Sequence, residues 1–112
     1  MSQSRIEIFQ EMLKAQPEDV MIWYGLGNEY FKMEKWNESA EALSNVIKFN
    51  SDYTAAYQML GTALLNAGKK NEARDIWQKG IETAERTGAW KAKQHLEGLL
   101  ADVKENESEF CE

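Results

Sequence analysis

Cysteine, histidine and proline each occur only once in these 112 residues. The single thiol, Cys111, excludes an internal disulfide and is typical of a protein from a reducing compartment. No apolar run approaches the length that spans a membrane, and residues 1–7 lack the continuous apolar stretch of a secretory signal. We therefore expect a soluble, cytoplasmic protein with one domain over residues 1–104.

Basic residues are also scarce, because 13 lysines and arginines stand against 19 acidic residues and give a net charge of −6. The chain has no basic cluster beyond the pair Lys69–Lys70. Binding to phosphates requires a concentrated positive surface. The composition therefore argues against nucleic acid or an anionic membrane as a partner.

Side chains that could carry chemistry are few and far apart. His95 and Cys111 are distant in the chain and fall in different predicted segments, and no Cys/His spacing resembles a structural zinc site. We interpret the carboxylates of two segments as a solvated helix face: Glu38, Glu41, Glu72 and Asp75. The sequence thus predicts neither catalysis, nor a cofactor, nor a bound metal.

The residues that are abundant favour helices throughout, since Ala, Glu, Lys and Leu dominate and only seven glycines are present. Apolar residues at helical spacing predict a first helix over residues 3–15, which Pro17 ends. Asp19 is predicted to cap the second helix, and Gly68 is predicted to stop the fourth in a left-handed conformation.

One helical pattern occurs twice at a fixed distance. The residues Trp23, Leu26, Gly27 and Tyr30 recur, one 34-residue period later, as Tyr57, Leu60, Gly61 and Leu64. A constant period of this length indicates stacked helix pairs, here residues 20–53 and 54–87. A third copy is absent, because residues 88–104 carry a different apolar stripe, made of Ala92, Leu96, Leu99, Leu100 and Val103. We interpret residues 88–104 as a capping helix and residues 105–112 as an acidic, mobile tail.

These residues resemble the tetratricopeptide repeat, a 34-residue unit with the pattern W-x2-L-G-x2-Y, then A-x3-F-x2-A, then P. The second halves match less fully, since Leu43 replaces an aromatic residue and Ser51 replaces the proline. The resemblance implies an all-α, right-handed helix-turn-helix superhelix (a TPR-like α-solenoid) of about six helices. Residues 3–15 would form an N-terminal half-repeat helix.

Glycine at both residue 27 and residue 61 indicates a close helix crossing in each unit. Inside a helix, glycine costs about 1 kcal/mol relative to alanine, a cost that closer packing of the paired helices would offset. We expect Gly27 to face Ser39 and Gly61 to face Ala73.

A second stripe lies beside the core stripe of each first helix. Its members are Met21, Tyr24, Asn28, Phe31 and Lys32, and their equivalents Ala55, Gln58, Thr62, Leu65 and Asn66. The resemblance implies that such positions line a concave groove that holds a ligand peptide. Asn28 coincides with the asparagine of the family's carboxylate clamp, but Tyr24, Ala55 and Met59 replace the clamp's basic residues. Alternatively, Tyr24, Phe31 and Leu65 only pack between adjacent first helices.

Two functions remain open at this point. The first is a non-catalytic protein–protein interaction module that binds a peptide or helix of a partner protein in the groove. The alternative is a homodimer or larger homo-oligomer that pairs through the exposed apolar edge of residues 3–15, where Ile8 and Met12 are the candidates.

Overall fold

The computed structural model describes the backbone of residues 2–111 and the side chains of residues 5–103. Within this range the chain forms six α-helices: α1 Ser2–Ala15, α2 Val20–Lys32, α3 Trp36–Phe49, α4 Thr54–Asn66, α5 Lys70–Thr87 and α6 Trp90–Cys111. The predicted all-α repeat solenoid is confirmed. None of these helices combines the length and the apolar composition needed to cross a bilayer.

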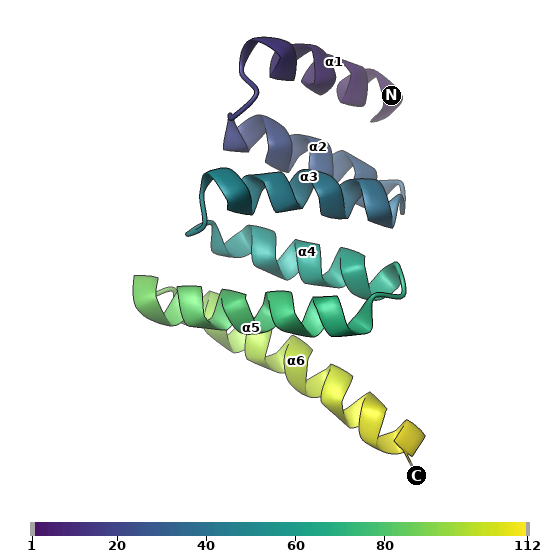
Figure 1. The fold of residues 1–112 in the computed structure, drawn as a ribbon, viewed down its shortest axis with the longest axis vertical. Helices are drawn as coiled ribbons and strands as arrows, with labels where there is room; N and C mark the ends of the chain where they lie inside the picture. The colour runs from purple at the N-terminus through teal and green to yellow at the C-terminus, as the bar shows by residue number, and fades with distance from the viewer. Residues whose placement is uncertain (1, 112) are drawn as a thin grey trace.

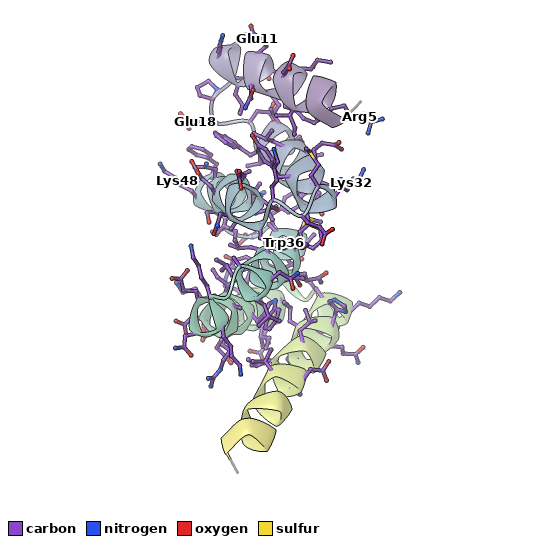
Figure 2. All side chains as sticks on the ribbon, turned by 90° about the vertical axis from the view of Figure 1, so that its right-hand side faces the viewer. Arg5, Glu11, Glu18, Lys32, Trp36 and Lys48 are labelled. Carbon is purple, nitrogen blue, oxygen red and sulfur yellow. The ribbon has the colours of Figure 1, made fainter. Side chains whose placement is uncertain are left out.

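The helices stack along one axis and give a flat, elongated body of 49 × 30 × 18 Å (Figure 1). Each helix packs mainly on the next one along the chain, and α4 also contacts α6. Seen from the side, α3 with Lys48 lies on one side of the stack and α2 with Lys32 on the other (Figure 2). The pairs α2–α3 and α4–α5 thus occupy the two predicted repeat units.

The signals that begin and end the helices act as the sequence predicts. The Asp19 carboxylate accepts hydrogen bonds from the backbone N–H groups of Met21 and Ile22, at 2.9 and 3.3 Å. Gly68 adopts a left-handed conformation, with φ of +84°, one residue after Ala67, the C-cap of α4. The last helix differs from the prediction, because α6 continues beyond Lys104 to Cys111. No glycine or proline interrupts that segment, and the predicted mobility of the tail concerns side chains outside the described residues.

Two clusters of buried side chains hold the stack together. The larger one joins α3 to α6 and contains Leu43, Leu60, Trp77 and Leu96 among its members. The smaller one consists of Ile6, Leu26 and Ala42, with half-buried aromatic neighbours from α1 and α2. Helix α1 is therefore attached to the body through a cluster of its own.

Both glycine crossings exist, and a large side chain opposes each glycine most closely. A Cβ atom at Gly27 would lie 2.8 Å from Cγ of Leu43, and one at Gly61 would overlap the indole of Trp77. The nearest side chain thus belongs to the residue one turn beyond the expected Ser39 or Ala73 on the paired helix. Ser39 does contact Gly27, because its hydroxyl donates to the carbonyl oxygen of Gly27 at 2.8 Å.

Candidate functional site

Side chains from α2, α4 and α6 line an open hollow of about 210 Å³. Its lining consists of Tyr24, Phe31, Ala55, Gln58, Met59, Thr62 and His95. Five of the ten groove residues predicted from the sequence thus lie together, namely Tyr24, Phe31, Ala55, Gln58 and Thr62. We call this hollow the concave groove.

The α2 side of the concave groove is built from two half-buried rings. The ring centres of Tyr24 and Tyr53 lie 5.1 Å apart. Those of Phe31 and Trp36 lie 5.0 Å apart, and these two rings meet edge-on. Both rings also pack against the larger core cluster. These contacts hold the rings in place without burying them, and they are compatible with the predicted alternative, in which the rings pack between adjacent first helices.

Burial, and to a lesser degree the neighbouring Tyr53, raises the pKa of Tyr24 above the ordinary value of a tyrosine. The Tyr24 hydroxyl therefore stays protonated at neutral pH. A neutral phenol on a rigid ring can both donate and accept a hydrogen bond.

Helix α4 contributes two polar side chains to the lining of the concave groove, Thr62 and Gln58, which differ in their internal hydrogen bonds. The Thr62 hydroxyl donates to the backbone carbonyl of Gln58 at 3.0 Å, and the Trp77 indole N–H approaches the same oxygen at 3.4 Å. Within the described part of the chain, the Gln58 side-chain amide has no hydrogen-bond partner. This amide can therefore bind a ligand without breaking an internal contact.

Two lining residues, Met59 and His95, are absent from the predicted set. Met59 follows Gln58 on α4, and the sequence resemblance places it only where the clamp would have a basic residue. His95 lies one turn before the half-buried Leu99, at the border of the apolar stripe of α6. Its place could have been inferred from that stripe, but not from the 34-residue period, which α6 does not follow.

The other five predicted residues lie outside the lining of the groove. Met21 is exposed, and its sulfur accepts a 3.9 Å contact from the Tyr53 hydroxyl. Lys32 approaches the buried Glu29 carboxylate at 3.5 Å. Leu65 packs against the core, Asn66 is exposed and Asn28 is half-buried. The lining consequently contains no lysine, arginine, aspartate or glutamate.

Residues with described side chains form no group of three or more His, Cys, Asp or Glu side chains that could hold a metal ion. In the groove, the one imidazole is surrounded by aromatic, amide, hydroxyl and thioether groups. The arrangement offers apolar area and hydrogen bonds to a ligand.

No family model matches the chain. A tetratricopeptide-repeat-containing protein of Pseudomonas aeruginosa is 29% identical over 95 residues, which cover 85% of this chain and 90% of that protein. The match therefore extends over nearly the whole length of the relative.

Two of the solved structures with a similar fold cover most of the chain. A protein from Bordetella parapertussis superimposes with a TM-score of 0.80 at 22% identity and covers 92% of this chain and 90% of its own. The TPR2B domain of yeast Sti1, in a complex with pHsp70, gives a TM-score of 0.81 at 15% identity, over 90% of this chain and 81% of that domain. The 34-residue spacing of the helix pairs agrees with both the sequence match and these structures, and the chain is similar in sequence and fold to tetratricopeptide-repeat proteins.

Proposed function

We propose that the chain is a non-catalytic protein-interaction module that holds an extended or helical segment of a partner protein in the concave groove. The observation that carries the proposal is a lining without acidic residues, lysine or arginine, with rigid aromatic rings on α2 and, on α4, the Gln58 amide, which has no partner among the described side chains. The TPR2B domain in complex with pHsp70 has the same fold, which supports the protein-interaction class.

The chemistry of the groove defines the kind of segment that it accepts. Half-buried aromatic rings provide apolar area at low entropic cost, and the Gln58 amide can pair with a peptide backbone. Because the lining carries no acidic residue, lysine or arginine, we expect binding to weaken only slightly as ionic strength rises. Tyr24, Ala55 and Met59 line the groove where a carboxylate clamp needs basic residues, so an internal segment should bind as well as a free C-terminus.

The test begins with selection of linear peptides from a display library on the wild-type chain. The best peptide is then synthesised and titrated by calorimetry against the wild type and Tyr24→Ala. Truncation of the aromatic anchor should weaken binding by about 1–3 kcal/mol, roughly five- to 150-fold in Kd. The free acid and the C-terminal amide of the peptide should bind equally.

Glu82→Ala is the matched control, because Glu82 is exposed on α5 and lies outside the lining of the groove. Circular dichroism verifies that all variants are folded. Equal affinities for the wild type, Tyr24→Ala and Glu82→Ala would place the binding surface elsewhere. Loss of binding on amidation would show that the groove recognises a carboxylate after all.

One observation favours a second candidate function, self-association. Ile8 and Met12 on α1 are 57% and 44% exposed, although both are large and apolar. Together with Glu7 and Glu11 they line an open hollow on α1. A second copy of the chain could cover this surface.

A further inference from the structure

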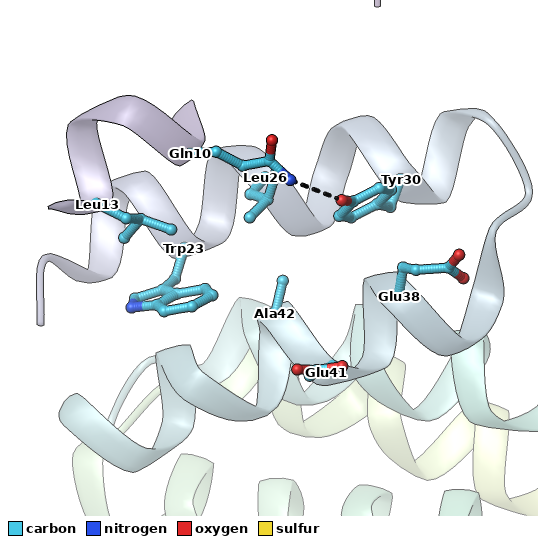
Figure 3. A pocket seen from close by; sticks show the side chains of 8 residues that line it. All are labelled: Gln10, Leu13, Trp23, Leu26, Tyr30, Glu38, Glu41 and Ala42. Carbon is cyan, nitrogen blue, oxygen red and sulfur yellow. Dashed lines mark hydrogen bonds between the residues drawn. The ribbon is translucent and has the colours of Figure 1, made fainter. Parts of the chain in front are cut away.

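A second hollow, of about 250 Å³, lies between α1, α2 and α3 (Figure 3). It uses a different face of α2 from the concave groove, because Trp23 and Leu26 line it in place of Tyr24 and Phe31. Leu13 and Ala42 complete its apolar part, and the carboxylate-bearing Glu38 and Glu41 complete its polar part. We call this hollow the inter-helix pocket.

Hydrogen bonds hold two of the rings around the inter-helix pocket in place. The indole N–H of Trp23 donates to the carbonyl oxygen of Pro17 at 2.8 Å. The side-chain amide of Gln10 donates to the Tyr30 hydroxyl at 3.4 Å, which ties α1 to α2 across the pocket (Figure 3). The Trp23 and Tyr30 rings are thus held in place before binding, and they have little conformational freedom left to lose.

The second repeat unit shows why the pocket is open. One 34-residue period after Ala42 stands Ile76, and one period after Leu13 stands Ile47; both isoleucines pack against the core. Tyr57, the equivalent of the half-buried Trp23, is only 4% exposed. The small side chain of Ala42 therefore leaves space in the first unit that a larger side chain occupies in the second.

The inter-helix pocket also carries negative charge, on the side formed by α3. Glu38 and Glu41 are exposed at neighbouring positions of α3, and neither carboxylate has a partner among the described residues. An occupant that suits the pocket must combine an apolar stem with a positive head.

We propose that the inter-helix pocket binds an arginine side chain from a basic segment of a partner protein. The methylene stem lies on the apolar part formed by Trp23, Leu26 and Ala42, and the guanidinium pairs with the carboxylates of Glu38 and Glu41. Arginine fits better than lysine, because its planar head stacks on aromatic faces, is weakly hydrated and donates two parallel hydrogen bonds to a carboxylate.

The probe is the capped tripeptide acetyl-Ala-Arg-Ala-amide, and its control carries citrulline, which has the same shape but no charge. Binding is followed by NMR through the indole N–H signal of Trp23, assigned with Trp23→Phe. The arginine peptide should shift this signal in a saturable manner. The citrulline peptide should bind about tenfold more weakly, because it lacks the charge-assisted hydrogen bonds.

Variants then locate the site. Ala42→Ile fills the pocket with the side chain that the second unit already carries at the equivalent position, and it should abolish the shift. The double variant Glu38→Gln, Glu41→Gln should weaken binding about tenfold while keeping the surface residues similar in size. Its matched control is Glu72→Gln, Asp75→Asn, which changes the equivalent carboxylates of the second unit and should leave binding unchanged.

Two results would overturn the proposal. Equal affinity for the arginine and citrulline peptides would show that charge is not recognised. An equal loss of affinity for the arginine peptide in the two double variants would show that the negative charge of the chain attracts the peptide without a defined binding site. If Ala42→Ile fails to fold, as judged by circular dichroism, the two double variants still decide between these results.

Discussion

Gly61 and Gly98 are both helical glycines, but their surroundings differ completely. A Cβ atom at Gly61 would overlap the indole of Trp77, whereas one at Gly98 would have no described atom within 4 Å apart from those of its own stretch of helix. Gly61→Ala should therefore lower the free energy of unfolding by about 1–3 kcal/mol, because Trp77 is fully buried and cannot move aside.

Gly98→Ala is the matched control for this prediction. It adds the same methyl group in open space and should raise the free energy of unfolding by about 0.5–1 kcal/mol, since alanine favours the helix. Thermal and urea unfolding of both variants measure the difference. Stabilisation by both alanines would contradict the close crossing at Gly61.

At this scale the sequence predicts which residues are special, but not always what they touch. A glycine repeated at 27 and 61 indicates two close approaches, and both occur. The identity of the opposing residue depends on how far one helix slides along the other. That offset is set by the volumes of Leu43 and Trp77 at the crossing, which no period in the sequence encodes.

At the scale of whole helices, three ends share one hydrogen-bond pattern. The backbone N–H groups of Lys35, Lys69 and Ala89 each donate to the carbonyl five residues earlier, at 3.0, 2.8 and 2.9 Å. The preceding residue is left-handed in each case, but at the end of α2 it is Glu34, with φ of +59°, and not a glycine.

Glu34→Gly should therefore stabilise the protein. A side chain in the left-handed conformation costs about 1–2 kcal/mol, and part of the gain is lost to the flexibility of glycine in the unfolded chain, so we expect a net increase of about 0.5–1 kcal/mol. Glu34→Ala removes the carboxylate but keeps Cβ, and its stability should not rise. A lower melting temperature for Glu34→Gly than for Glu34→Ala would contradict this prediction.

The turn between α3 and α4 is tied to the end of α5 by an ion pair. Arg86 donates to the Asp52 carboxylate at 2.6 Å, and this hydrogen bond, aided by the positive charge, lowers the pKa of Asp52 below the ordinary value of an aspartate. A carboxylate with a lowered pKa in the folded state contributes stability above its unfolded pKa, and this contribution is lost as the pH falls through the folded pKa.

NMR titration of the Asp52 carboxyl carbon measures the effect directly. The midpoint should lie below the usual range for aspartate and return to it in Arg86→Gln. Because both side chains are exposed, we expect little change in the melting temperature at neutral pH. An ordinary midpoint in the wild type would show that the pair is not formed in solution.

How well a helix could be predicted depends on whether it belongs to a repeat. Helices α2 to α5 follow the 34-residue period, and their caps at Asp19 and Gly68 act as predicted. Helix α6 follows its own apolar stripe, so the period could not place His95 in the concave groove. The same period, applied to groove residues, selected Gln58 and Thr62, which line the hollow, and also Asn66, which α4 presents to solvent.

At the scale of the whole molecule, the exposed apolar surface of α1 makes the self-association hypothesis testable. If Ile8 and Met12 pair with a second copy, the mass in analytical ultracentrifugation should rise with concentration, and Ile8→Lys should keep the chain monomeric. The melting temperature of the monomer should not change, because Ile8 does not contribute to the core.

Met21→Lys is the control, since Met21 is 62% exposed on α2, away from this surface. Its self-association should equal that of the wild type. A wild-type chain that remains monomeric at the highest concentration removes the hypothesis.

The attachment of α1 through its own small cluster has a consequence for the order of unfolding. In a stack whose helices pack mainly on their neighbours along the chain, the parts need not open together. Helix α1 shares few buried contacts with the larger cluster of α3 to α6, so we expect its amides to exchange with deuterium earliest and those around Trp77 last. The molecule would then have a gradient of local stability along its long axis, lowest where both the inter-helix pocket and the exposed apolar surface lie.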